Sequence, residues 1–278
     1  MKQVLQARLQ RYWDMRAAGN FSFGGTGSGL VMAAALGLAI GLPSALSLAV
    51  GLALIGLGLF CVWLEIGRPW RALNVFFHPR TSWMTREAML VPPLMAVGVA
   101  AIVLDIRFVV LAALFAAGFL YCQARMLHAA RGIPAWCQKE TVPLIVATGI
   151  AEGTGLFLAV AGAPPAMIGA ALCAVILREV AREFHRRGLI KAKAPAGTLA
   201  WFALREERVL TAARYATIAL LALALAGWNT AAIGGLMAVA TGWGLKVMLI
   251  TRAAFTRGHV IKNTPARGRD PSHVIIPS

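Results

Sequence analysis

Long apolar runs, separated by more polar connections, occupy almost the whole chain. A helix that crosses the hydrocarbon core of a bilayer takes about 20 predominantly apolar residues. Because lipid offers the backbone no hydrogen-bond partners, such runs are expected to be helical. The pattern predicts an all-α, polytopic membrane protein with eight transmembrane helices in a bundle, at residues 21–41, 43–64, 86–104, 107–126, 141–161, 164–184, 211–228 and 230–250.

The two ends of the chain are more polar than its middle. Residues 1–19 mix apolar and basic side chains without the apolar core of a signal peptide, so they predict an amphipathic helix on the membrane surface. Residues 20–251 make up the eight-helix membrane domain, and residues 252–278 form a basic tail. Such a tail can become ordered on a partner protein, or it can simply touch lipid headgroups.

Short turns alternate with long connections along the chain, so the predicted helices pair as hairpins. Among the Lys and Arg residues of the turns, connections and tails, Arg107 alone lies on the side of the short turns. Short loops rich in Lys and Arg stay in the cytoplasm. We therefore expect a multi-pass protein of the inner (cytoplasmic) membrane, with both termini in the cytoplasm.

The composition favours the same class of protein. Hydrophobic residues make up 59% of the 278 residues and charged residues 14%, whereas soluble domains average about 25% charged residues. The formal net charge of +16 would suggest nucleic acid as the partner of a soluble chain. Here the basic residues lie between apolar runs, so the lipid bilayer explains the charge and no nucleic-acid partner is expected.

The densest charge in the chain joins the second and third apolar runs, at residues 61–87. Charged groups at the mouth of a membrane span are costly and often handle a substrate or ion. An Arg-rich cytoplasmic loop with Trp at the headgroup level is the alternative interpretation. The candidate site residues here are Glu65, Arg68, Trp70, Arg71, Trp83, Arg86 and Glu87.

Glu152 is a further candidate, because it lies among small residues in the middle of the fifth apolar run. A carboxyl at that depth could carry protons or hydrogen-bond a ligand; a structural carboxyl that faces another helix is the alternative. Lys246, near the inner end of the last run, is expected to extend toward the membrane surface. The glycines from Gly24 to Gly29 are expected to allow close helix packing, since the strand that a dinucleotide-binding loop needs is absent.

The sequence gives no sign of a prosthetic group in this chain. The five His residues lie in connections, tails or span ends, whereas membrane-embedded haem needs paired ligands within the helices. The four Cys residues lack the close spacing of an iron–sulfur cluster, and no spacing supports a metal site. What remains is a transiently bound quinone, ubiquinone or menaquinone, which needs an apolar slot for its ring and hydrogen-bond donors and a proton source for its carbonyls.

Three stretches carry a resemblance to a known family: EIGRPWRALN at 65–74, SWMTRE at 82–87 and QARMLHAARGIPAW at 123–136. They resemble motifs after the second span, at the start of the third span and after the fourth span of one group of proteins. That group is the membrane-anchor subunits of dimethyl sulfoxide reductase-type molybdoenzymes, within the polysulfide reductase/NrfD-like superfamily. The eight apolar runs extend the similarity over nearly the whole chain.

The resemblance implies two partners on the cytoplasmic side, an iron–sulfur cluster subunit and a molybdopterin catalytic subunit. The chain itself would be a non-catalytic anchor that exchanges electrons between the clusters and quinone, as in the inward-facing sulfite- or phenylacetyl-CoA-oxidising complexes. Glu87 matches the family's Glu at the start of the third span, which is associated with quinol handling. Glu65 stands where the family has a His with the same association.

Two other functions stay open at this stage. A secondary transporter would also have many spans, although no sequence repeat is found between the hairpins. A structural tether would hold soluble subunits at the membrane without a quinone site. Substitution of Glu87 separates the first interpretation from the tether, because only a quinone-reactive anchor would lose electron transfer.

Overall fold

Long helices dominate the computed structural model, which describes all residues except 1–2, 6, 67–68, 258 and 262–278. The side chains of residues 3–5, 69, 71–72 and 259–261 are likewise outside the description. Within the described residues, each long helix has 20 or more residues: α1 (Met15–Ala39), α2 (Ala45–Glu65), α3 (Trp83–Val103), α4 (Val109–Ala129), α6 (Thr141–Val160), α7 (Pro165–Lys191), α9 (Arg205–Leu225) and α10 (Ala231–Thr251).

Seven of these helices are long and apolar enough to cross a membrane, and they make the chain a multi-pass membrane protein. The prediction of helices able to span a membrane is confirmed for these seven. The remaining helix, α7, falls short of the apolar composition of a span. Arg178, Glu179 and Arg182 lie in the stretch that would have to cross the bilayer.

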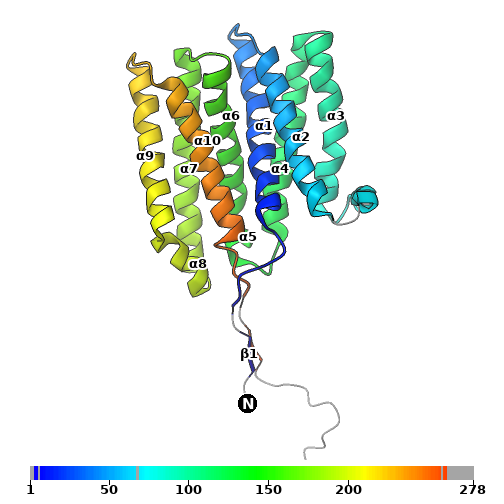
Figure 1. Ribbon diagram of the computed structural model, residues 1–278, viewed down its shortest axis with the longest axis vertical. Helices are drawn as coiled ribbons and strands as arrows, with labels where there is room; N and C mark the ends of the chain where they lie inside the picture. The colour runs from blue at the N-terminus through cyan, green and yellow to red at the C-terminus, as the bar shows by residue number, and fades with distance from the viewer. Residues whose placement is uncertain (1–2, 6, 67–68, 258, 262–278) are drawn as a thin grey trace, which may run out of the picture.

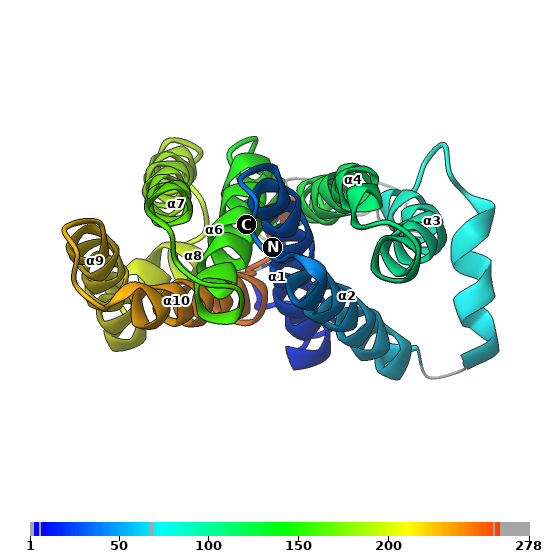
Figure 2. The same cartoon turned by 90° about the horizontal axis from the view of Figure 1, so that it is seen from above.

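The helices stand side by side, with α1 and α6 in the middle of the row (Figure 2). Helix α1 packs against α2, α4, α6 and α10, and α6 also packs against α7 and α10. Helix α3 packs on α4 toward one end of the molecule, and α9 packs on α7 and α10 at the other (Figures 1 and 2). This arrangement gives the bundle two halves that share α1 and α6.

The connections alternate between the two ends of the bundle, as the sequence predicts (Figure 1). At the short-turn end, Gly41, Gly162 and Gly227 follow α1, α6 and α9 with positive φ, a conformation that favours glycine after a helix. At the opposite end, which we call the long-connection end, lie the short elements η1 (Pro69–Phe77), α5 (Pro134–Cys137), α8 (Ala196–Ala200) and η3 (Trp201–Ala203). A further short helix, η2 (Ile106–Phe108), makes the turn from α3 to α4.

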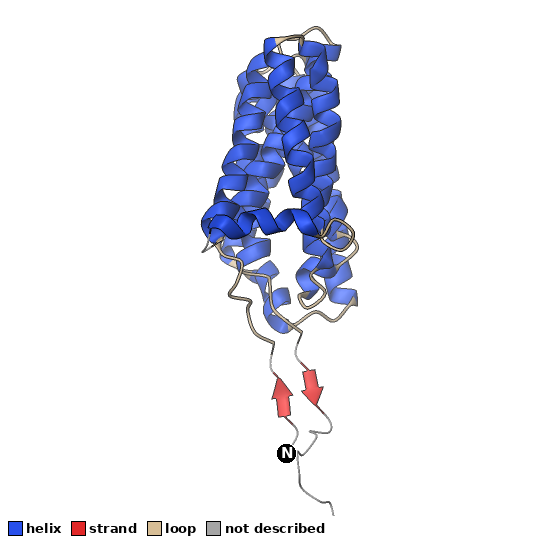
Figure 3. Cartoon of the chain, turned by 90° about the vertical axis from the view of Figure 1, so that its right-hand side faces the viewer, coloured by secondary structure: helices blue, strands red, loops and turns tan. Residues whose placement is uncertain are grey.

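The N-terminal segment differs from its prediction. Residues 7–14 are not helical, so the amphipathic helix expected within residues 1–19 is wrong for this stretch. Instead, β1 (Gln3–Leu5) pairs antiparallel with β2 (His259–Ile261), and Figure 3 shows this ribbon extending away from the helices. Helix α1 starts at Met15 because the Asp14 carboxylate accepts a hydrogen bond from the Arg16 backbone N–H.

Glycines allow the central helices to pack backbone against backbone. A Cβ atom at Gly29 of α1 would meet the carbonyl oxygen of Gly149 on α6, and one at Gly153 would meet the backbone of Gly29. Gly235 of α10 lies as close to the backbone of α6. The glycine run therefore serves close helix contact, as small residues do in membrane bundles.

Candidate functional site

A pocket of about 710 Å³ opens between α2, η1 and α3 at the long-connection end. This volume lies within the range of ligand pockets, about 300–1,000 Å³. Glu87 is the only ionisable group among the described residues that line it. The apolar side chains of the wall are Leu59, Phe60, Val62, Trp63, Ile66, Val75, Phe76, Met84, Ala88, Val91 and Pro92.

Two prolines shape the α3 side of this pocket. Pro92 and Pro93 lie inside α3 and have no N–H to donate. A proline within a helix removes the hydrogen bond to the carbonyl four residues earlier. The carbonyl of Ala88, which lines the pocket together with Pro92, therefore lacks its helical partner. The pocket thus combines a largely apolar wall with one carboxyl, Glu87, and the side chain of Asn74.

Glu87 is buried where α1, α3 and α4 meet. Its side chain is 4% exposed, and its nearest polar neighbours are the side-chain amides of Asn20 on α1 and Gln123 on α4. The side-chain amide of Gln123 donates to the backbone carbonyl of Asn20 at 3.2 Å. Within the described part of the chain, Glu87 Oε1, Asn20 Oδ1 and Gln123 Oε1 have no hydrogen-bond partner. We call these three residues the Glu87 cluster.

The sequence interpretation missed Asn20 and Gln123. Both interrupt or border an apolar run, and both are 3% exposed or less. A buried polar group without a hydrogen bond is unfavourable by about 1–3 kcal/mol. Three of them in one place indicate a cluster built to meet a polar ligand or a proton. Their polarity within an apolar run was the available signal.

Glu65 lies beside a second, smaller pocket of about 240 Å³. This pocket shares Val62, Ile66 and Met84 with the larger one, and Asn20 also lines it. Glu65 is the last residue of α2 and is partly exposed. Glu87 and Glu65, two of the three carboxyls that the sequence singled out, therefore lie on adjoining pockets.

A hydrogen bond from Arg16 links the start of α1 to the end of α2. The Arg16 guanidinium contacts the Asp14 carboxylate at 2.8 Å and donates to the Leu64 carbonyl at 2.9 Å. Hydrogen bonds from the Arg16 side chain and backbone lower the pKa of Asp14. Asp14 therefore stays ionised through the physiological pH range and keeps this contact next to Glu65.

Trp83 and Arg86 point away from the larger pocket. The Trp83 ring packs against α4, with its edge toward Tyr121 at 5.8 Å and the Arg125 guanidinium over its face at 4.7 Å. The Arg86 guanidinium covers the ring at 4.2 Å and donates to the carbonyls of Pro79 and Arg80, both at 2.8 Å. These residues hold the connection before α3, whereas Trp63, absent from the sequence prediction, lines the pocket.

Other candidate residues lie in the connection from α2 to α3, and the structure describes only some of them. Trp70 lies in η1 and is 86% exposed, so it does not line the pocket. Arg68 lies outside the described residues. Arg71 belongs to η1, but its side chain lies outside the described part as well.

Glu152 is separate from the Glu87 cluster. It lies on α6 and pairs with Lys246 of α10 at 2.6 Å, and both side chains are fully buried. The expectation that Lys246 extends toward the membrane surface is therefore wrong. The reason is that a buried carboxylate holds the ammonium inside the bundle.

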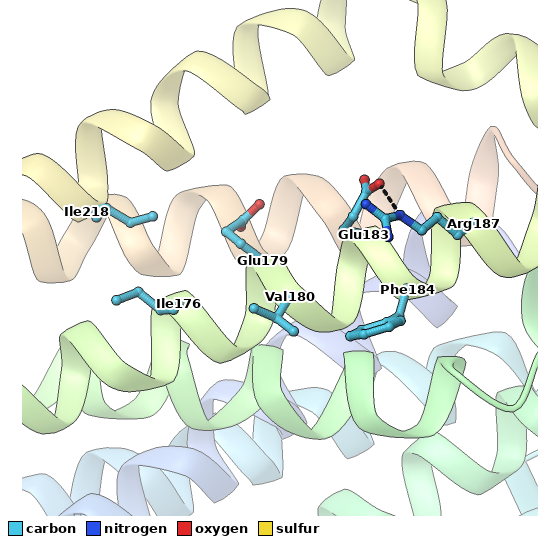
Figure 4. A pocket seen from close by; sticks show the side chains of 7 residues that line it. All are labelled: Ile176, Glu179, Val180, Glu183, Phe184, Arg187 and Ile218. Atoms are coloured by element: carbon cyan, nitrogen blue, oxygen red, sulfur yellow. Dashed lines mark hydrogen bonds and ion pairs between the residues drawn. The ribbon is translucent and has the colours of Figure 1, made fainter.

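A third cavity lies in the other half of the molecule. It measures about 330 Å³ and is lined by Ile176, Val180 and Phe184 of α7 and Ile218 of α9 (Figure 4). Its charged residues are paired already: Glu183 accepts from Arg186 and Arg187, and Glu179 contacts Arg178 and Arg182. This cavity consequently lacks the free polar groups that distinguish the larger pocket.

The part of the chain that the structure describes contains no group of three or more His, Cys, Asp or Glu side chains that could hold a metal ion. The buried His185 ring contacts the Ala135 carbonyl at 2.8 Å through Nε2. Neither protein-family models nor curated proteins give a match to this chain. The pocket and its carboxyl are therefore the features from which function is inferred.

Proposed function

We propose that this chain is the integral-membrane anchor and quinone-reactive subunit of a cytoplasm-facing molybdenum/iron–sulfur oxidoreductase. The observation that carries the proposal is a single buried carboxyl, Glu87, in a largely apolar pocket of about 710 Å³ that Asn74 also lines. An apolar slot suits a quinone ring, and a carboxyl with a free oxygen suits its carbonyl.

Different residues would bind the ring of the quinone, bind its carbonyl and exchange protons. Phe60, Trp63 and Phe76 offer aromatic surface for the ring of the quinone. Glu87 would donate a hydrogen bond to a quinone carbonyl and pass it a proton, and the Asn20 and Gln123 amides would hold the carboxyl. Glu65, on the adjoining pocket, would exchange protons with the aqueous side. A bound quinone supplies the two-electron, two-proton chemistry.

The wider proposal includes the whole complex. The eight long helices, α7 among them, would form the transmembrane bundle in the inner membrane. Both termini and the long-connection end would face the cytoplasm, because the basic residues gather there. An iron–sulfur subunit would dock on that end and connect the pocket to a molybdopterin catalytic subunit. The exposed aromatic Trp70 and Tyr12 are at hand for such contact.

The first test is a mild-detergent purification through this chain, followed by metal analysis and identification of co-purifying subunits. Molybdenum or tungsten with abundant iron and two soluble subunits supports the anchor. A lone chain without metal, recovered reproducibly, contradicts it and favours the transporter.

The second test is Glu87→Gln in the purified complex. General acid–base groups contribute about 10²–10⁴-fold to rate, so quinone-analogue reduction should fall by a factor in this range. Assembly and membrane attachment should persist, because the amide retains the shape of the side chain. Glu206→Gln is the matched control, since Glu206 is exposed at the start of α9. Unchanged quinone reduction in Glu87→Gln contradicts the assignment of the pocket.

A further inference from the structure

An ion pair at the centre of the bundle has no part in the pocket described above. Lys246 Nζ donates to Glu152 Oε2 at 2.6 Å, and both side chains are fully buried. Burial of two charges in a low-dielectric interior is unfavourable by several kcal/mol for each ion, and ionisable groups inside a membrane protein usually serve a function. Neither residue lines the larger pocket or the pocket of Glu65.

Three helices hold the Glu152 carboxyl in a defined position. Its Oε2 accepts a second hydrogen bond from the Thr26 hydroxyl of α1 at 2.8 Å, and this hydroxyl accepts from the Trp243 indole of α10 at 2.8 Å. Its other oxygen, Oε1, has no partner among the described residues and faces Gly242. The carboxyl therefore keeps one oxygen free to take a proton.

One turn of α1 lies between this pair and the Glu87 cluster. Lys246 Nζ donates to the Phe21 carbonyl at 2.9 Å, and the Gln123 amide donates to the preceding carbonyl, that of Asn20. Both donors reach the helix because Gly24 and Gly25 lack side chains. A Cβ atom at either glycine would meet one of these two donor nitrogens.

We propose that Lys246 and Glu152 form a proton-exchange site in the centre of the bundle, with the proton as its ligand. In the first step an N–H bond of the ammonium breaks and an O–H bond forms at Glu152, which leaves a neutral amine and a neutral acid. In the second step the amine takes up a new proton and the acid releases its own. Each cycle passes one proton and changes no oxidation state.

The physical basis is the opposition between attraction and lost solvation in two forms of the pair. The ion pair retains its mutual attraction but has lost the solvation of two charges, whereas the neutral pair carries no charge to solvate. A donor–acceptor distance of 2.6 Å is short for a hydrogen bond between nitrogen and oxygen. Among the described residues, the other charge that acts on the pair is Arg178 of α7, which donates to the Ala238 carbonyl.

A route from the Glu87 cluster to this pair rests on the proposed function, whereas proton exchange at the pair does not. The chain purified alone is sufficient for the measurement. Infrared difference spectra across a pH titration, in H₂O and in D₂O, report the protonation of buried carboxyls. We expect a C=O band of a protonated carboxyl that grows as the pH falls and shifts in D₂O.

Substitutions assign the band and make the proposal falsifiable. Glu152→Gln should remove the band, whereas Glu87→Gln should leave it. In Lys246→Met the C=O band should appear at higher pH, since the Glu152 carboxyl loses its positive partner. If a single variant fails to fold, the wild-type titration and the double variant Glu152→Gln/Lys246→Met give the same assignment.

Gly25→Ala tests the contact with α1 without altering any ionisable group. The new methyl group would displace the Lys246 ammonium from the Phe21 carbonyl. The pH at which the C=O band appears should therefore change. Gly56→Ala is the control, because Gly56 of α2 has open space around its Cα. A Glu152 carboxylate that stays ionised at every pH at which the protein remains folded overturns the proposal. Quinone reactivity is measured separately, so its failure would leave this result in place.

Discussion

Glu87 and Glu152 are both buried carboxyls of one helix bundle, yet their surroundings differ. Glu87 lies beside a large apolar pocket with two neutral amides as neighbours and no ion-pair partner among the described residues. Glu152 has no such pocket and is held by Lys246, Thr26 and the close packing of Gly242. The first carboxyl has space for a ligand beside it, and the second is enclosed by protein.

The difference follows from how the helices pack around each carboxyl. Around Glu152, glycines of α1, α6 and α10 bring backbones into contact and leave no room for a ligand. Around Glu87, the connection from α2 to α3 keeps the two helices apart and η1 closes the gap from the side. A carboxyl next to space can meet a ligand, whereas an enclosed carboxyl needs a partner within the protein.

The largest expected effect comes from removing one member of the ion pair. Lys246→Met leaves the Glu152 carboxylate buried without its counter-ion, so the protein should lose about 3–5 kcal/mol of stability. Thermal unfolding in detergent measures the loss.

The double variant provides the control for this prediction. Lys246→Met combined with Glu152→Gln removes both charges, so most of the lost stability should return. Equal unfolding temperatures for the single and the double variant would contradict the view that the unpaired charge is the cause.

Much of the fold was predictable from the sequence because its signals are local. The apolar runs predict eight spans, of which seven correspond to helices long and apolar enough to cross a membrane, and the alternation of short turns with long connections predicts the hairpins. Helix α7 deviates because Arg178, Glu179 and Arg182 interrupt its apolar run. The structure pairs such charges within the protein, with Arg178 and Arg214 both contacting Glu179. Composition along the chain does not report such pairing.

The second-largest expected effect tests the close backbone packing of α1 against α6. In Gly29→Ala the new methyl group would fall against the Gly149 carbonyl, which belongs to the backbone and cannot rotate away. Overpacking of a close-packed core usually lowers stability by about 1–3 kcal/mol. Thermal unfolding should show this loss, with Gly56→Ala close to the wild type because its site is open. Equal stability of the two variants would mean that α1 and α6 can move apart.

The candidate site was predictable only in part. Glu87 stood out because a carboxyl opens the third apolar run, and Glu152 because it interrupts the fifth. Asn20 and Gln123 come from other helices, so only the tertiary packing shows that they meet Glu87. The pairing of Lys246 with Glu152 spans 94 residues, and no local pattern contains it. Trp83 was a candidate site residue, but its ring packs against Tyr121 of α4 and does not line the pocket.

The smallest expected effect concerns Trp83, which does not line the pocket but holds the connection before α3. The Arg86 and Arg125 guanidinium groups both lie over the Trp83 ring, at 4.2 and 4.7 Å from its centroid. A cation–π contact at a partly exposed site is worth about 0.5–1 kcal/mol, so Trp83→Leu should lower stability by roughly the sum of two such contacts. Thermal unfolding measures this change.

Trp70→Leu is the matched control, because the Trp70 ring is 86% exposed. Substitution of a surface residue without specific contacts usually changes stability by less than about 0.5 kcal/mol. A similar loss in both variants would show that general hydrophobic contact, and not the two guanidinium groups, explains the role of Trp83. If Trp83→Leu alone is destabilised, the connection before α3 depends on these contacts, and Glu87 keeps its place beside the pocket through them.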